Sequence, residues 1–178
     1  ASSTIPQFRL SREALKRDIE RVESQGVRFE LNTALGVDVS LQSLRERHEA
    51  LFIAIGAGAG RKLGIEGEES DLVIDALSFL QLARAARPPK LGSDVVVIGG
   101  GNAAIDAART AKRLVGDKGR VPIVYRRTRD ELPADPEEME TALDEGISLM
   151  ELASPRCIAA GEKRGCFALE CSLMELGE

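Results

Sequence analysis

Three consecutive glycines stand near the middle of the chain, between an apolar run and a helix-forming sequence. The run Val95–Ile98 leads into Gly99–Gly101. Gly99, Gly101 and Ala104 occupy the three spaced positions of the dinucleotide fingerprint G-x-G-x-x-G/A. The first glycine lets the chain turn out of a strand, the second leaves room for a pyrophosphate, and the alanine lets the helix pack closely. The spacing therefore predicts a phosphate-binding turn, because unpaired N–H groups and the helix dipole favour negative charge there.

A second candidate group follows the next predicted strand, Val121–Tyr125. Tyr125, Arg126 and Arg127 stand at its end, and no carboxylate is among them. In a dinucleotide-binding fold this point lies beside the adenosine ribose, where an acidic residue favours NAD and an arginine accommodates the 2′-phosphate of NADP. Two planar, permanently charged side chains therefore predict NADPH. Two alternatives stay open: the arginines are solvated on a loop, or they neutralise an acidic helix predicted over residues 135–145.

The elements around these residues alternate between strand and helix. Helices are predicted over residues 102–115, stopped by Gly116, and over 135–145, stopped by Gly146; a third strand covers 147–152. A β-hairpin follows, with strands over 157–160 and 167–174 and a turn over 161–165. Asp106 is expected to interact with the dipole of the first helix. The order predicts an α/β fold with a Rossmann-like βαβαβ parallel sheet and a β-hairpin.

The first part of the chain has a different pattern. Helices are predicted over residues 11–25, 40–47 and 71–86, with the last ended by Arg87-Pro88-Pro89. Strands are predicted over Val27–Leu31 and, as a buried type, over Leu51–Ile55. The second of these runs into glycines at 56, 58 and 60, but this cluster lacks the spacing of a dinucleotide loop.

Composition excludes several classes of function. The chain has 178 residues, 43% hydrophobic and 30% charged, and a formal net charge of −5, so a nucleic-acid or anionic-membrane surface is not expected. Its three cysteines, Cys157, Cys166 and Cys171, fit neither a disulfide framework nor a metal site, and we expect buried, inert thiols. We find no catalytic acid or base, and His48 is expected at the surface. The first residues carry no signal pattern, so we expect a fragment of a longer cytoplasmic chain.

Several motifs together resemble one family. The stretches at 99–110 (GGGNAAIDAART), 124–128 (VYRRT) and 132–134 (LPA) resemble the small subunit of bacterial NADPH-dependent glutamate synthase and its flavoprotein relatives. Residues 5–10 (IPQFRL), 50–57 (ALFIAIGA) and 174–178 (MELGE) are similar to further segments of that family.

The resemblance implies two dinucleotide-binding domains, one for FAD and one for NADPH, with hydride passing from NADPH to the flavin and electrons on to iron–sulfur clusters or a partner subunit. It implies a partial flavin-domain segment over residues 1–57, a crossing loop and helix over 58–93, and an NADPH-binding domain over 94–178. The flavin fingerprint and cysteine clusters of the family are absent from these residues, so we expect NADPH binding without FAD retention or turnover. The cofactor-binding residues expected from fingerprint and resemblance are Gly99, Gly100, Gly101, Asn102, Ala103, Ala104, Tyr125, Arg126 and Arg127, with Gly56 and Ala57 facing the flavin side.

The sequence argues against two other classes of function. A regulatory module that senses NAD(P) without chemistry would have no reason to carry the flavin-type segments before residue 58. A methyltransferase would place an acid at the end of the second strand, where Tyr125 and Arg126 stand.

Overall fold

The computed structural model describes residues 3–56, 58, 60–161 and 166–176. The chain divides into two compact units, one formed by Ala1–Arg9 with Ala59–Glu178 and the other by Leu10–Gly58. Among the described residues, no helix has both the length and the apolar character needed to cross a membrane. The two units are described separately.

The larger unit is built on a three-stranded parallel sheet. Its strands β1 (Val97–Ile98), β2 (Pro122–Val124) and β3 (Ser148–Met150) lie in the order β1-β2-β3, with Val97 opposite Ile123. Pro122 opens β2, a position at which a strand tolerates proline. The βαβαβ prediction is confirmed, and the strands line up so that β1 and β2 end at the same edge.

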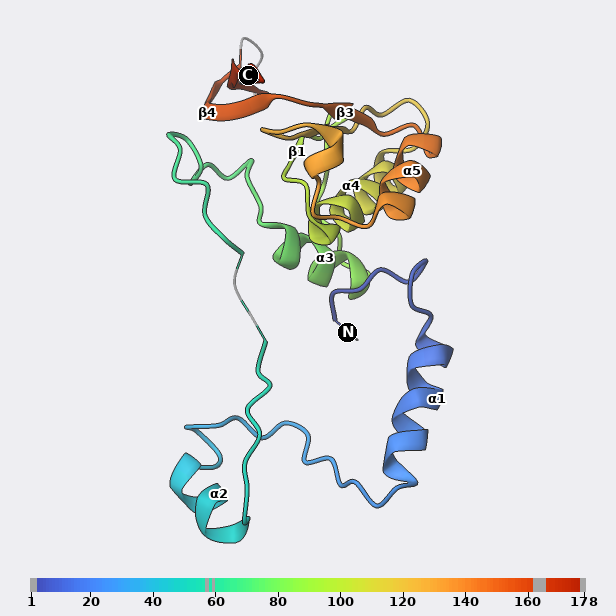
Figure 1. Cartoon of the computed structure of the whole chain (residues 1–178), viewed down its shortest axis with the longest axis vertical. Coiled ribbons are helices and arrows are strands. Elements are labelled where there is room, and N and C mark those ends of the chain that lie inside the picture. The colour runs from blue at the N-terminus through green and yellow to red at the C-terminus, as the bar shows by residue number, and fades with distance from the viewer. Residues whose placement is uncertain (1–2, 57, 59, 162–165, 177–178) are drawn as a thin grey trace. The chain divides into compact units, whose positions relative to one another are not determined.

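Three helices lie on one side of these strands in Figure 1: α3 (Ala76–Arg84), α4 (Asn102–Val115) and α5 (Pro136–Asp144). Helix α4 packs against both α3 and α5. It has the predicted bounds, and Gly116 ends it with a φ of +71°. The core between helices and sheet is formed by Phe79, Leu80, Ile105, Ala107, Ala108, Ala111, Val121, Ile123, Ala134, Met139, Ala142 and Ile147.

Helix α3 is shorter than predicted. The side chain of Asp75 accepts hydrogen bonds from the N–H groups of Leu77 and Ser78 and so fixes the start of the helix at Ala76. The residues before Asp75 form turns and loop. The apolar pattern before this cap therefore overstated the length of the helix.

The predicted hairpin is present as β4 (Ala153–Ala160) and β5 (Phe167–Leu173), which pair antiparallel. Most of the predicted turn, residues 162–165, lies outside the described residues. The expectation of buried cysteines is wrong, because Cys166 is exposed and both Cys157 and Cys171 are half-buried. Partial burial raises the pKa of the Cys157 and Cys171 thiols, which keeps them protonated at neutral pH.

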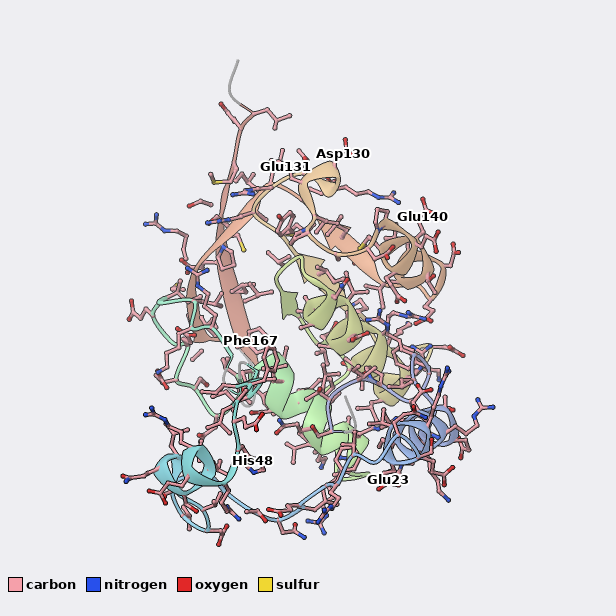
Figure 2. All side chains as sticks on the ribbon, turned by 60° about the horizontal axis from the view of Figure 1, so that its bottom comes forward. Glu23, His48, Asp130, Glu131, Glu140 and Phe167 are labelled. Carbon is pink, nitrogen blue, oxygen red and sulfur yellow. The ribbon has the colours of Figure 1, made fainter. Side chains whose placement is uncertain are left out.

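The smaller unit contains α1 (Arg12–Glu23) and α2 (Leu41–Arg47), capped by Ser11 and Ser40. Both helices are confirmed. His48 follows α2 and is exposed, as predicted (Figure 2).

The two strands predicted in the smaller unit are absent. Residues 27–31 and 51–55 have no strand structure, and Phe52 is 94% exposed. Within the described part of this unit, β pairing is limited to an isolated bridge between Leu35 and Val39. A strand needs a neighbour for its backbone N–H and C=O groups, and these segments have none there.

Candidate dinucleotide site

The candidate site lies where β1 ends and α4 begins. Gly99 has a φ of +134°, a conformation that side-chain-bearing residues rarely adopt, and its N–H donates to the carbonyl of Val124 on β2 (3.0 Å). A Cβ built at Gly99 would lie 3.4 Å from the Cβ of Ala104, an ordinary contact that places Ala104 directly beside this turn. The backbone conformation, rather than lack of space, therefore favours glycine at 99.

The next two glycines face different surroundings. A Cβ built at Gly100 would lie 2.5 Å from Cδ2 of Leu132 and 2.6 Å from Cε2 of Tyr125, so packing inside the chain requires this glycine. A Cβ built at Gly101 would meet no atom within 4 Å, and the residue has ordinary extended dihedral angles (φ −91°, ψ 170°). Nothing among the described residues requires glycine at 101, whose open face is accessible to a ligand.

The first turn of α4 offers backbone donors beside that open face. Gly101 is the N-cap and, among the residues described, no side chain caps the helix. The N–H groups at the start of a helix have no partner within it, and the helix dipole adds positive potential. Asn102 and Ala103 are exposed, whereas Ala104 is buried against the strand. This arrangement fits a pyrophosphate, which accepts hydrogen bonds and carries negative charge.

A short strap, defined here as residues Leu132–Asp135, closes over the glycine loop. The N–H of Ala134 donates to the carbonyl of Gly100 (3.1 Å), and the N–H of Asp135 donates to Oδ1 of Asn102 (3.0 Å). The side chain of Asn102, predicted to hold cofactor, therefore binds the chain's own backbone.

Tyr125, Arg126 and Arg127 follow β2 at the edge where the glycine loop follows β1. Tyr125 is 9% exposed, and its ring packs against Gly100 while its hydroxyl donates to the carbonyl of Glu131 (2.9 Å). Tyr125 therefore forms a wall behind the loop. Arg126 and Arg127 are exposed.

The turn after these arginines, η1 (Arg129–Glu131), is marked by Asp130 and Glu131 in Figure 2, where Glu140 marks α5. Oε2 of Glu131 accepts from the N–H (3.2 Å) and hydroxyl (3.0 Å) of Thr128, and these bonds hold the pKa of Glu131 below its usual range. Nε of Arg127 lies 3.9 Å from Oε1 of Glu131, a loose and exposed pair. Neither Arg126 nor Arg127 forms an ion pair with α5 in the described residues, so the helix-neutralising alternative finds no support.

Glu138 of α5 and Glu145 directly after it pair with other arginines, in a network that the sequence reasoning missed. Arg9 Nη1 lies 3.1 Å from both carboxylate oxygens of Asp106, and Arg9 Nε lies 3.3 Å from Glu138. Asp106 is only 6% exposed, and its burial raises its pKa although the hydrogen bonds from Arg9 oppose the shift. The predicted interaction of Asp106 with the helix dipole is therefore wrong, since it lies beyond the first turn and binds Arg9.

Two arginines of α4 extend the network. Arg109 and Arg113 both bind Glu145, at 2.8 and 2.7 Å, and the ring of Phe8 stacks on both guanidinium groups, at 4.6 and 3.9 Å from their central carbons. Burial alone would raise the pKa of Glu145, but the hydrogen bonds from Arg113 and Arg109 outweigh it and lower the pKa to about 2. Phe8 and Arg9 lie in the segment 5–10, which resembles a segment of the glutamate synthase small-subunit family. That resemblance was the one feature of the sequence that pointed to these two residues.

Two predicted residues lie away from this loop in the chain. Gly56 belongs to the smaller unit, has a φ of +68°, and is exposed with open space around it. Ala57 lies outside the described residues.

A family model for pyridine nucleotide-disulphide oxidoreductases matches residues 5–162. The chain belongs to the pyridine nucleotide-disulphide oxidoreductase family. It is 37% identical over 177 residues to the NADPH-Fe(3+) oxidoreductase subunit beta of Geobacter sulfurreducens, covering 98% of this chain and 26% of the relative. It is 32% identical over 185 residues to the glutamate synthase [NADPH] small chain of Escherichia coli K12, covering 98% of this chain and 39% of the relative.

The fold agrees with this assignment. Mycobacterium tuberculosis FprA, solved in complex with NADPH, superposes with a TM-score of 0.71 at 18% identity, covering 96% of this chain and 57% of that one. The likeness supports a Rossmann-like fold. The chain spans about a quarter of the length of the first of these two relatives and about two fifths of the second.

Proposed function

We propose that residues 94–178 bind NADPH and present it to a flavin held by other parts of a longer oxidoreductase. In this proposal residues 1–57 are a segment of the flavin domain and residues 58–93 cross between the domains. Membership of the family supports NADPH as the cofactor, as do the names of two relatives, which both include NADPH.

The observation that carries the proposal is the contrast between Gly100 and Gly101. Gly100 is required by the packing of Tyr125 and Leu132, whereas the space at Gly101 is open. Gly101 is the N-cap residue of α4 but has no side chain to bond to the first N–H groups. A glycine that the chain itself does not need at this position suits a pyrophosphate that approaches the backbone. Gly99 and Ala104 shape the loop, and their own N–H groups bind the carbonyls of Val124 and Gly101. Asn102 and Ala103, which are exposed in the first turn of α4, supply the N–H groups for the ligand.

The preference for NADPH over NADH is assigned to Arg126 and Arg127. Both are exposed after β2, and the carboxylates of Glu138, Glu140 and Glu145 pair with other arginines. A hydrogen bond to a charged group contributes about 1.5–3 kcal/mol, so two guanidinium groups on the 2′-phosphate favour NADPH by roughly a hundredfold or more.

The whole protein is proposed to be an oxidoreductase that works in the cytoplasm. Bound NADPH would supply hydride to the flavin, and the electrons would then pass to a partner subunit or to iron–sulfur clusters. The two relatives are named as a subunit and as a small chain, which supports a partner. This chain's residues bind and orient the nucleotide, and no step is assigned to a group in the smaller unit.

Calorimetric titration of this chain with NADPH and NADH tests the assignment. We expect NADPH to bind about a hundredfold more tightly, and we expect the Arg126→Ala/Arg127→Ala variant to lose this preference while NADH binding is retained. Arg120→Ala is the matched control, because it removes an exposed arginine before β2, at the opposite end of the strand.

Equal affinities of the unmodified chain for the two nucleotides would overturn the role of the arginines. Equal collapse of both affinities in the double variant would show that Arg126 and Arg127 support the fold instead. Binding of neither nucleotide would overturn the site itself.

A further inference from the structure

Asn102 is the first residue of α4. Its position predicted contact with the cofactor, but its side chain binds the backbone of Asp135. We propose that Asn102 is a positioning residue: its amide oxygen holds the strap Leu132–Asp135 on the glycine loop, and its neutrality keeps the start of α4 free for a pyrophosphate. This inference rests on the proposed dinucleotide-binding function and names a residue that controls that site.

Two adjacent residues of the strap bind the loop on either side of Gly101. The N–H of Ala134 donates to the carbonyl of Gly100 at 3.1 Å, and the N–H of Asp135 donates to Oδ1 of Asn102 at 3.0 Å. Because the donor is a backbone N–H, the oxygen of the Asn102 amide must face it, which fixes the orientation of that side chain. Gly101 is thereby held from both neighbours while its own face stays open.

The strap also connects the loop with the segment that carries the arginines. The side chain of Leu132 lies against Gly100 together with the ring of Tyr125. The Tyr125 hydroxyl binds the carbonyl of Glu131, the residue directly before the strap. The strap therefore spans from the turn after Arg127 to the start of α4, so its position fixes both ends of the site.

The choice of asparagine over aspartate follows from charge. Both side chains place an acceptor oxygen at the same distance from the backbone, and the helix dipole favours the negative one at the start of a helix. A carboxylate at 102 would keep the bond from Asp135 and stabilise α4. It would also place a fixed negative charge beside the N–H groups that a pyrophosphate needs. The amide keeps the hydrogen bond from the Asp135 N–H, called the latch below, without adding a negative charge.

Two variants separate the latch from the charge. In Asn102→Ala the Asp135 N–H loses its acceptor, and we expect its amide hydrogen exchange to speed up about tenfold, with NADPH and NADH affinity both falling about tenfold. In Asn102→Asp we expect slow exchange at Asp135 and an equal or higher melting temperature, yet at least a tenfold loss of affinity for both nucleotides. Asn32→Asp is the matched control, since it adds the same charge in the smaller unit.

The measurements are amide exchange by NMR, thermal unfolding, and calorimetric titration with NADPH and NADH. Wild-type affinity in Asn102→Asp would overturn the argument from charge, and unchanged exchange at Asp135 in Asn102→Ala would overturn the latch. In Asn102→Asp the melting temperature should stay equal or rise while the affinity for both nucleotides falls. A residue with a purely structural role would not give this combination. Failure of the unmodified chain to bind either nucleotide would instead remove the proposed function.

Discussion

The two units of this chain contrast in what their apolar residues do. In the larger unit Ile123 and Ile105 are 0% and 1% exposed, and helices cover a parallel sheet. In the smaller unit no described residue is buried, and Ile53 and Ile55 are 63% and 83% exposed. The sequences 121–125 and 51–55 are similarly apolar, so composition does not distinguish them. What differs is the neighbours: the first has a strand on either side, and the second has none among the described residues of its unit.

The largest expected difference between the units is the effect of removing an isoleucine side chain. Ile123→Ala should lower the free energy of unfolding by about 2–5 kcal/mol, because it leaves a cavity between the sheet and its helices. Ile53→Ala is the matched substitution in the smaller unit and should change stability by no more than about 0.5 kcal/mol, since the side chain is already in water. Urea unfolding measures both. Similar losses at the two positions would contradict the contrast.

The helices could be predicted in both units because their signals are local. Ser11 and Ser40 cap α1 and α2 within their own first turns, and the glycines at 101 and 116 bound α4. The strands could be predicted only where partners exist. Val27–Leu31 and Leu51–Ile55 have strand-forming sequences, but pairing depends on residues remote in the chain, which a local pattern does not contain.

The candidate site also contains some features that local sequence patterns predict and others that depend on residues remote in the chain. The glycine loop and the arginines after β2 could be found from spacing, because the order of strands and helices places both at one edge of the sheet. The bond from Asp135 to Asn102 joins residues 33 positions apart, and that from Arg9 to Asp106 joins residues 97 apart. The place of Asp106 in α4, just beyond the first turn, does not reveal which side chain it binds. The approach of Arg9 is a property of the folded chain.

A smaller effect concerns ion pairs, which also differ between the units. The folded-state pKa of Glu145 is lowered from 4.5 to about 2, so its stabilisation is complete above pH 4.5 and is lost as the pH falls toward 2. Glu145→Gln should therefore cost roughly 3 kcal/mol at pH 7, and the difference from the unmodified chain should vanish near pH 2. Glu20→Gln, which breaks an exposed pair with Lys16 on α1, should cost no more than about 0.5 kcal/mol. Urea unfolding between pH 2 and 7 tests this, and a pH-independent difference at Glu145 would contradict it.

The smallest effect sharpens the contrast inside the larger unit itself, between two neighbouring glycines. Gly100→Ala places a methyl group against Tyr125 and Leu132 and should lower the free energy of unfolding by about 1–3 kcal/mol through overpacking. Gly101→Ala meets open space at dihedral angles that alanine adopts freely, so its stability should stay within about 0.5 kcal/mol of the unmodified chain. Its methyl group nevertheless occupies the face at which we propose that the pyrophosphate binds, so NADPH affinity should fall. Urea unfolding and calorimetry on the same two variants distinguish a glycine required for packing from a glycine required for ligand binding. If Gly101→Ala also lowered the free energy of unfolding by more than about 1 kcal/mol, both glycines would be required for packing.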